Sequence, residues 1–172
     1  MTERIAPGDS PFSLADALTA WAAGVTLVTI ADGRDDIGTT VSAFCPVSAD
    51  PPLVAVALMA ESYPAEVLGR LDIFAVTLLG SAQRALAGRF AAAGRPGARL
   101  LLDAVPHHRG ALSGALIPDD GLAALECSVT QRIEAGDHLL LLAEVRAVPR
   151  VAPRGDPLIR FRGRYPALAA ES

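Results

Sequence analysis

Runs of apolar and β-branched residues predict a chain built mainly from short strands. Such runs occupy residues 25–30, 37–44, 53–58, 73–79, 122–133 and 138–148, and each is bounded by glycine, proline or acidic residues. Asp32-Gly33 and Ala135-Gly136-Asp137 each separate two of these runs and are typical of hairpin turns. A last strand is expected over residues 157–165.

Three short helices are expected between the strands. The first covers residues 13–24, where apolar positions recur at helical spacing after the capping pair Ser13 and Asp16. The second begins at Ser62, which precedes a proline-containing first turn. The third is capped by Ser81 and ends at Gly94. These helices interrupt the strands without alternating regularly with them.

The order of the elements predicts one domain that is mainly β with peripheral helices. Five to seven strands in close succession favour a barrel over a doubly wound parallel sheet. Residues 95–120 are rich in glycine and proline, which predicts a long irregular segment. Loops of this length in a compact domain tend to have a function or to lie at an interface. Residues 1–12 show little periodicity and are expected to be a flexible N-terminal arm, so that the domain spans residues 13–168.

Composition and charge exclude several classes of partner. The chain is 51% hydrophobic with a mean hydropathy of +0.36, yet its apolar runs are much shorter than the roughly 18 residues of a membrane span. The excess therefore predicts a subunit interface, and we expect a homodimer. A net charge of −4 without long basic runs argues against nucleic-acid binding. Two distant cysteines and the lack of a secretory leader favour the cytoplasm.

Common catalytic motifs are missing from the sequence. No serine lies in a GxSxG elbow, which argues against a hydrolase triad. His107 and His108 are adjacent and His138 stands alone, so no metal site is expected. Neither a Walker loop nor a GxGxxG motif between a strand and a helix is present, so a Rossmann-type nucleotide site is not expected either.

Residues 38–52 form the most unusual segment, a strand followed by a loop rich in hydroxyl groups. One interpretation is an amphipathic strand with a polar face. The other is a cradle for an anionic, planar ligand, in which small side chains let backbone N–H groups approach a ring edge and Ser48 donates to a phosphate. Ser81 at a helix start and Arg89 on the same helix would fit such a site.

Several short motifs resemble the flavin reductase components of two-component monooxygenases. They lie in residues 24–29, 38–44 with 47–53, 74–79 with 83–90, 136–138 and 157–165, in the family's order over residues 15–168. Each motif is weak alone, but five in order are specific. The resemblance implies an FMN-binding split β-barrel, a dimer, FMN or FAD as the flavin, NADH or NADPH as the hydride donor, and a partner monooxygenase that receives reduced flavin.

The resemblance also implies roles for individual residues. Residues 39–42 would line the isoalloxazine edge, Ser48 and nearby backbone the ribityl-phosphate end, and residues 81–90 the rest of the flavin. His138 would face the nicotinamide as the catalytic residue, although a surface histidine after a hairpin turn is the alternative. The implied cofactor-binding residues are Thr39, Thr40, Val41, Ser42, Cys45, Val47, Ser48, Ser62, Thr77, Ser81, Gln83, Arg89 and Phe90.

The chain departs from the family pattern at two positions. Thr77 stands where asparagine is usual, and Arg160 stands where an aromatic residue often precedes the final Phe-Arg-Gly. Cys45 allows two interpretations, a redox thiol or a small buried hydrophobe, and we expect the second. Arg160, Arg162 and Arg164 fit a 2′-phosphate of NADPH and an exposed strand face equally well.

The reaction implied by the resemblance needs positioning more than acid–base chemistry, because the nicotinamide and flavin themselves carry out hydride transfer. Two alternatives remain open. One is a flavoprotein of the same fold that holds its flavin tightly and acts directly on an organic substrate, with residues 95–120 shaping the pocket. The other is a noncatalytic barrel that binds a protein or pigment.

Overall fold

The computed structural model describes residues 13–33 and 35–168, and the predicted arm of residues 1–12 lies outside that part. Its fold is mainly β with peripheral helices, as predicted. The strands are β1 (Ala23–Gly24), β2 (Thr26–Asp32), β3 (Asp35–Val41), β4 (Phe44–Ala49), β5 (Pro52–Met59), β6 (Ile73–Leu78), β7 (His107–Arg109), β8 (Leu116–Pro118), β9 (Ala123–Ala135), β10 (His138–Ala147) and β11 (Ile159–Arg160).

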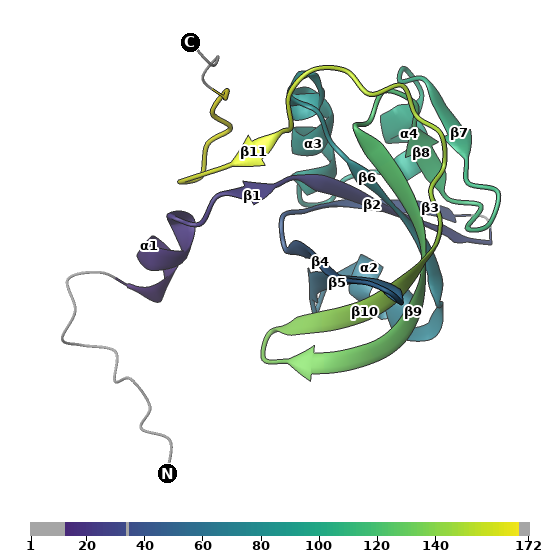
Figure 1. Ribbon diagram of the computed structural model, residues 1–172, viewed down its shortest axis with the longest axis horizontal. Coiled ribbons are helices and arrows are strands. Elements are labelled where there is room, and N and C mark those ends of the chain that lie inside the picture. Colours follow the sequence, from purple (N-terminus) through teal and green to yellow (C-terminus); the bar gives the residue numbers. More distant parts are fainter. Residues whose placement is uncertain (1–12, 34, 169–172) are drawn as a thin grey trace.

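Seven of these strands form one strongly curved antiparallel sheet in the order β3-β2-β6-β9-β10-β5-β4 (Figure 1). Its two edge strands, β3 and β4, follow each other in the sequence and are joined by residues 42–43, but they are not hydrogen-bonded to each other in this sheet. The predicted hairpins are present, with Gly33 and Gly136 at positive φ in their turns. The sheet therefore curls round and stays split between β3 and β4.

The concave face of the sheet encloses the main hydrophobic core. Alternate residues of β2, β3, β5, β6, β9 and β10 point into it, and helix α2 (Tyr63–Arg70) contributes three buried side chains, as period-2 alternation and an amphipathic helix require. Cys127 is completely buried there, and burial raises the pKa of its thiol to about 12. This cysteine is therefore a packing residue without thiolate chemistry at neutral pH.

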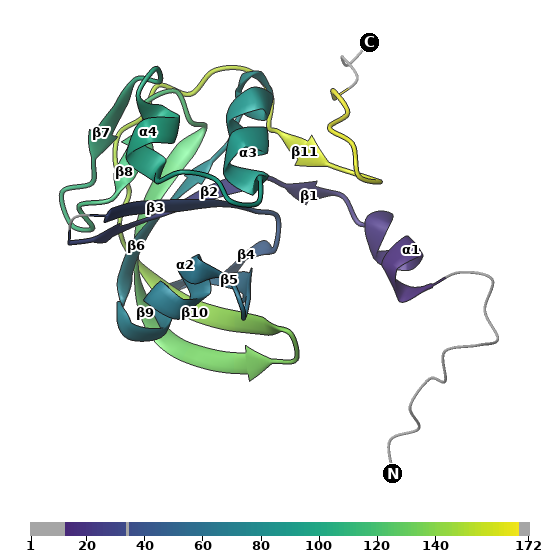
Figure 2. The ribbon, with the colours of Figure 1, turned by 180° about the vertical axis from the view of Figure 1, so that it is seen from behind.

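A second core lies outside β2 and β3, where helices α3 (Arg84–Ala91) and α4 (Ala98–Leu102) cover the sheet. Figure 2 shows α3 and α4 on one side of β3 and α2 on the other. Phe90 of α3 is fully buried against Gly38 of β3, where a Cβ atom would lie only 2.4 Å from the phenyl Cε1. The glycine therefore allows α3 to approach the strand closely.

Helix starts follow the sequence in two of three cases. Ser13 and Asp16 form a capping box at α1 (Leu14–Thr19), and the Ser62 hydroxyl accepts a hydrogen bond from the Ala65 N–H at α2. The prediction that Ser81 caps the third helix is wrong. Residues Ser81–Gln83 form a 3-10 turn whose N-cap is Gly80, and the Gln83 side chain accepts the Gly80 N–H instead.

Three other expectations need correction. Residues 95–120 are not irregular throughout, because they contain α4 and the small β7–β8 hairpin. Residues 44–49 form strand β4, paired with β5, where a loop was expected. The last strand shrinks from residues 157–165 to the two residues of β11, which pair with β1. Strands β4, β7 and β8 are set by pairing with a neighbouring strand, and β11 by pairing with β1 at the other end of the chain, which local composition does not show.

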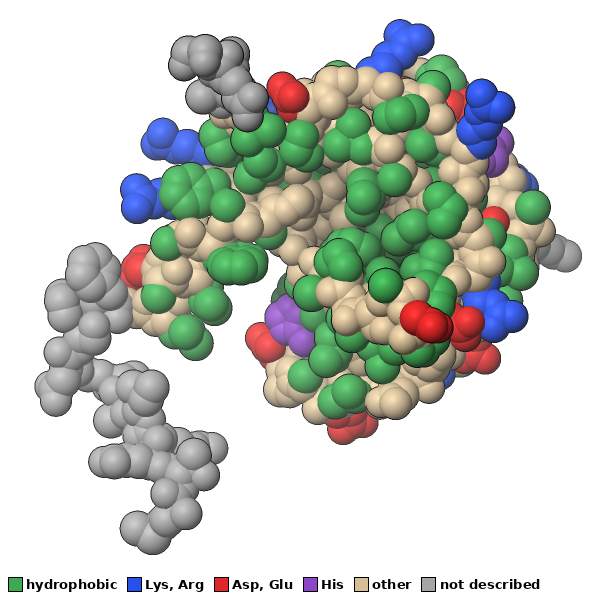
Figure 3. Space-filling model, viewed as in Figure 1, with side chains coloured by type: hydrophobic (Ala, Val, Ile, Leu, Met, Phe, Trp, Pro, Cys, Tyr) green, Lys and Arg blue, Asp and Glu red, His purple; other side chains and the backbone are tan. Residues whose placement is uncertain are grey.

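The first and last described segments form an arm beside the body. Strand β1 pairs with β11, and the Arg162 N–H donates to the Thr19 carbonyl, so α1 and the C-terminal segment are tied together. Helix α1 has no buried residue, and Leu14, Leu18 and Trp21 are 75%, 63% and 76% exposed. Figure 3 shows this helix standing off the body with hydrophobic side chains exposed. We call residues 13–24 and 159–168 together the arm, a name that from here on does not include residues 1–12.

A buried carboxylate fixes the loop between β7 and β8. Glu126 of β9 is 2% exposed, and its Oε1 accepts hydrogen bonds from the Leu112 N–H (3.0 Å), the Ser113 N–H (2.6 Å) and the Ser113 hydroxyl (2.7 Å). The carboxylate therefore ties this loop to β9. No helix in the described part of the chain is long and apolar enough to cross a membrane.

Candidate functional site

The connection between β3 and β4, the two strands at which the sheet is split, lies close to the start of β10. The Ala57 N–H donates to the Ala43 carbonyl at 2.9 Å, which extends the β4–β5 pairing back to the connection of residues 42–43. On the other side of β5, Met59 pairs with His138. The β3–β4 connection and His138 therefore lie at the same end of β5. We call Ser42, Ala43, Met59 and His138 the mouth.

The outer edge of β3 offers backbone groups to a ligand. Arg95 Nε donates to the Gly38 carbonyl at 2.8 Å, so the backbone of Gly38 points away from β2. Because N–H and C=O groups of alternate residues in an antiparallel strand face the same side, those of Thr40 also point outward. A flavin pyrimidine edge presents carbonyl, N–H and carbonyl groups, and an unpaired strand edge leading to Ser42 fits this donor and acceptor pattern.

Side chains of β3 divide between the two cores. The Thr40 hydroxyl donates to the Ala87 carbonyl of α3 at 2.7 Å, so this side chain holds the helix and is not free for a ligand. Val41 is buried in the main core, and Thr39, on the same face of the strand, is half-buried. Ser42 is half-buried at the mouth. Among residues 39–42, the Thr40 hydroxyl is therefore the group already engaged within the fold, while the backbone and the Thr39 and Ser42 hydroxyls are available to a flavin.

His138 occupies the first position of β10, directly after the hairpin turn. Its side chain is 39% exposed, and its Nδ1 lies 2.7 Å from a carboxylate oxygen of Asp137. That hydrogen bond lowers the pKa of the Asp137 carboxyl group. The hydrogen bond links the imidazole to the Asp137 side chain at the mouth.

The predicted residues of β4 lie on an accessible edge strand. Cys45 and Val47 are exposed and Ser48 is half-buried, and a register shift between Pro46 and Ser48 marks a bulge in the pairing with β5. The expectation that Cys45 is a small buried hydrophobe is wrong, because its strand lies at the sheet edge, where one side of the residue has no neighbour. This thiol is available to a ligand or a partner.

Other predicted residues are separated from the mouth by burial or by their partners. Thr77 and Phe90 are completely buried, and Thr77 Oγ1 has no hydrogen-bond partner among the described residues. Gln83 is 5% exposed and uses its amide on Gly80 and Asp120. These three side chains are buried within the fold, and their contact with a flavin stays a prediction.

Ser81, Arg89 and Ser62 have distinct surroundings. The Ser81 N–H donates to the Asp156 carbonyl, and Arg89 is exposed on α3. Ser62 follows β5 by three residues and lies next to the mouth, although its hydroxyl already caps α2. Ser81 therefore lies beside residue 156, Arg89 on α3 and Ser62 at the start of α2, and their joint role in one site stays a prediction.

A family model for the flavin reductase like domain matches residues 18–169, which is most of the chain. It spans β3, β4, β5 and the β9–β10 hairpin, and so includes every element of the mouth. The chain belongs to the flavin reductase-like family.

Individual members of the flavin reductase-like family match over nearly the whole chain. An NADH-dependent FMN reductase from Streptomyces nodosus subsp. asukaensis is 33% identical over 162 residues, covering 94% of this chain and 86% of the relative. The reductase component of 4-hydroxyphenylacetate 3-monooxygenase from Thermus thermophilus is 33% identical over 153 residues, covering 89% and 93%. The Streptomyces globisporus NADH:FAD oxidoreductase, solved with NAD and FAD fragments, superposes with a TM-score of 0.84 at 30% identity over 92% and 93% of the two chains.

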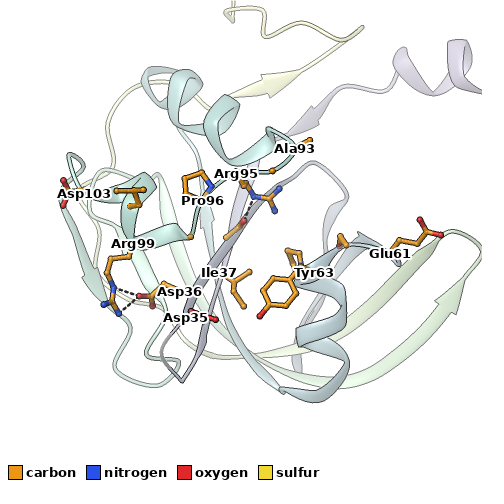
Figure 4. A pocket seen from close by; sticks show the side chains of 16 residues that line it. Asp35, Asp36, Ile37, Glu61, Tyr63, Ala93, Arg95, Pro96, Arg99 and Asp103 are labelled. Atoms are coloured by element: carbon orange, nitrogen blue, oxygen red, sulfur yellow. Dashed lines mark hydrogen bonds and ion pairs between the residues drawn. The ribbon is translucent and has the colours of Figure 1, made fainter.

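A groove of about 990 Å³ next to this flavin reductase-like mouth was missed by sequence reasoning. It follows the outer edge of β3 between the start of α2 and the α3–α4 connection (Figure 4). At one end Asp36 is buried and receives hydrogen bonds from Arg109 and Arg99, which hold the pKa of its carboxyl group below the ordinary value. No motif signals this groove, because its walls come from three segments far apart in the sequence.

Proposed function

We propose that this protein is an NAD(P)H-dependent flavin reductase that supplies reduced FMN or FAD to a partner monooxygenase. The proposal rests on the edge of β3, which pairs with no second strand among the described residues. This edge leads to the mouth, where the imidazole of His138 is hydrogen-bonded to Asp137. The edge supplies hydrogen-bonding groups for a planar ring, and the histidine stands where a second ring would enter. The names of the related reductases support the same activity.

The chain's own groups bind and orient in this proposal. A bound flavin supplies the hydride acceptor, and a nicotinamide supplies the hydride. The backbone of Thr40 and the Ser42 hydroxyl hold the ring edge, and backbone N–H groups there offset negative charge that develops on reduction. His138, held by Asp137, sets the angle at which the nicotinamide approaches. No side chain needs to take up a proton during hydride transfer.

Anaerobic spectrophotometry tests the function directly. FMN and FAD are added separately to the purified protein, and NADH and NADPH are compared as reductants. Catalytic bleaching of added flavin near 450 nm, with free exchange of the flavin, is the expected result. Tightly held flavin that is reduced only once favours the flavoprotein that acts directly on an organic substrate. A protein that takes up neither flavin is a noncatalytic barrel, and the proposal is then wrong.

Ser48 is proposed to bind the flavin phosphate from the accessible edge of β4. We expect Ser48→Ala to weaken FMN binding by about 1–3 kcal/mol, the usual contribution of a hydrogen bond to a charged group. Equilibrium titration with FMN measures this change. Riboflavin, which lacks the phosphate, is the matched control and should bind both proteins alike. Equal losses for FMN and riboflavin would show that Ser48 acts on the strand and not on the phosphate.

We further propose a homodimer in which the arm packs on a second copy. Leu14 and Leu18 lie on α1, a helix with no buried residue, and Trp21 follows just beyond its end; all three apolar side chains are exposed. Burying a side chain of this size stabilises an interface by about 1.5–3 kcal/mol. In an isolated chain these side chains stay in water, and this stabilisation is not gained. The arm also carries Arg160, Arg162 and Arg164, all exposed.

Sedimentation analysis of the full chain checks the dimer. Wild type should sediment at twice the chain mass of 17.8 kDa. Because Leu18 and Trp21 contact no core of their own copy, a Leu18→Glu/Trp21→Glu variant should fold normally, yet its dimer dissociation constant should rise at least about 100-fold. A wild-type mass of one chain, or a double variant that dimerises as wild type does, would contradict the proposal.

The partner is proposed to be a flavin-dependent oxygenase that accepts freely diffusing reduced flavin. Two relatives are named as reductase components of monooxygenases, and a solved relative is named as the flavin reductase component of a two-component tryptophan halogenase, which supports this assignment. A reducing cytoplasmic compartment is also proposed and is consistent with the two free thiols, Cys45 and Cys127.

A further inference from the structure

Edge strand β3 is held by the sheet on one side and by helices on the other. Its backbone pairs with β2, and no second strand pairs with it in the described part of the chain. Residues 36, 38 and 40, at alternate positions, are hydrogen-bonded to the layer that contains α3 and α4. Arginines of that layer donate to the Asp36 carboxylate and the Gly38 carbonyl. The Thr40 hydroxyl donates to the Ala87 carbonyl of α3 at 2.7 Å.

The hydrogen bond of Thr40 reaches a helix that is itself firmly packed. Ala87 and Phe90 of α3 are completely buried, and Phe90 packs on Gly38, two residues before Thr40. Figure 2 shows α3 lying along this side of β3. The strand is therefore held against α3 at two points, one by packing and one by a hydrogen bond. Two points fix the direction of the strand as well as its distance from the helix.

The strand has less support between Thr40 and the mouth. Val41 is the last residue of β3, and its carbonyl accepts the Thr26 hydroxyl of β2 at 2.9 Å. Residues 42 and 43 then cross the split. Among the described residues, Thr40 is thus the last of β3 to form a hydrogen bond with α3 or α4. The end of a strand that is paired on one side opens more readily than a strand paired on both sides.

The backbone of Thr40 is the part of β3 that is proposed to meet the flavin ring. Its N–H and C=O groups point to the open edge, as those of Gly38 do. A hydrogen bond weakens steeply when its angle departs from linearity, so the strand edge must keep one position to recognise the ring. A side chain that fixes this backbone therefore affects ring binding without touching the ring.

We propose that Thr40 is a positioning residue, whose hydroxyl bond to Ala87 holds the end of β3 in the geometry that recognises the pyrimidine edge of the flavin. The hydroxyl acts through the backbone of its own residue and through α3. This inference rests on the proposed flavin site and adds to it the group that sets selectivity for the ring. The flavin phosphate has no part in it.

Thr29 of β2 offers a matched control. It lies on the same face of the sheet as Thr40, because Thr40 pairs with Leu27, two residues before Thr29. Its hydroxyl donates to the Leu116 carbonyl of β8, also at 2.7 Å. Strand β2 pairs with both β3 and β6, so the Thr29 backbone stays in place without this bond. Thr29→Val therefore removes a similar hydrogen bond without freeing a strand edge.

Binding of lumiflavin and 3-methyl-lumiflavin to the full-length protein tests the role of Thr40. Both compounds lack the phosphate, and the second also lacks the N3–H that a strand carbonyl can accept. Wild type should bind lumiflavin at least about 10-fold more tightly than 3-methyl-lumiflavin. Thr40→Val should lower this ratio at least about 3-fold, because a loosened edge discriminates less. Thr40→Ser, which keeps the hydroxyl, and Thr29→Val should retain the wild-type ratio.

Two further measurements make the test independent of folding defects and of flavin. Thermal unfolding confirms that each variant is folded, and Thr40→Ala, which also lacks the hydroxyl, should behave as Thr40→Val does. In the ligand-free protein, amide hydrogens of residues 40–43 should exchange faster in Thr40→Val than in wild type, whereas Thr29→Val should leave them unchanged.

The outcomes separate the role of Thr40 from the flavin site itself. An unchanged lumiflavin ratio or unchanged exchange in Thr40→Val would overturn the positioning role, as would an equal loss of the ratio in Thr29→Val. In each of those cases wild type still discriminates between the two compounds. A wild type that binds neither compound, or binds both equally, would instead contradict the proposed flavin site, and the role of Thr40 with it.

Discussion

Replacement of Glu126 by alanine should lower the free energy of unfolding by about 3–5 kcal/mol. The substitution removes an acceptor that holds three donors of the β7–β8 loop and leaves two backbone N–H groups without that partner. A loss of this size is a large share of the roughly 5–15 kcal/mol that stabilises an ordinary domain. Urea unfolding followed by circular dichroism measures the change.

Glu126→Gln separates the acceptor from its charge. The glutamine can still accept from the Leu112 and Ser113 N–H groups, so we expect it to cost only about 1–2 kcal/mol. If Glu126→Ala unfolds at the wild-type urea concentration, the carboxylate is not an anchor. The loop would then be held by the β7–β8 pairing, by the hydrogen bond from Arg109 to the Gly114 carbonyl and by the packing of Ala115.

Replacement of His138 by alanine should slow flavin reduction by roughly 10-fold to 100-fold, equivalent to about 1.4–2.8 kcal/mol of barrier. The imidazole is oriented by Asp137 at the mouth, and its loss removes positioning without removing any group that transfers hydride. Flavin affinity should stay nearly constant. Stopped-flow absorbance with NADH measures the reduction rate, and equilibrium titration measures the affinity.

Asp137→Asn gives a graded comparison for the histidine. It retains a hydrogen-bonding side chain next to the imidazole but removes the charge, so the rate should fall between those of wild type and His138→Ala. A His138→Ala rate equal to wild type would make the histidine an ordinary surface residue. Complete loss of flavin binding would place the imidazole in the flavin pocket itself.

Local patterns were sufficient for the long strands and for two helix starts. The β2–β3 and β9–β10 hairpins are visible because their turns contain glycines at positive φ and lie between long runs of apolar and β-branched residues. Ser13 and Ser62 are visible because a capping hydroxyl acts within its own first turn. Interactions confined to a few neighbouring residues leave a signature that can be read in the sequence.

Pairing of very short strands, and contacts between residues far apart in the sequence, left no such signature. Strands β7 and β8 are three residues each and exist because they pair with each other across a glycine-containing loop. The exposure of Cys45 follows from the edge position of β4, which no local pattern states. Asp36 gathers arginines 63 and 73 residues away, so the groove next to it could not be found from spacing.

The candidate site could be predicted only in part, because some of its features also depend on contacts between segments far apart in the sequence. The hydroxyl-rich segment pointed to residues 39–48, and the structure leaves Ser42 and Ser48 with accessible surface while Thr40 is engaged with α3. His138 was found from a short turn motif, and its register with Met59 brings it to the end of the β3–β4 split. Burial of Thr77 and Phe90 depends on how α3 and β6 pack, which the motifs do not encode.

The two unpaired sheet edges also bear on aggregation, since an open strand edge is a template for pairing with another chain. Edge strand β4 carries Pro46, which has no N–H to donate, and a bulge beside it that breaks the regular spacing. Edge strand β3 has the Gly38 carbonyl already occupied by Arg95. Both edges are therefore interrupted near their middle. A small molecule can still bind the remaining backbone N–H and C=O groups. A strand from another chain would lose several hydrogen bonds at the interruptions, so the split admits small ligands but disfavours the strand addition by which fibrils grow.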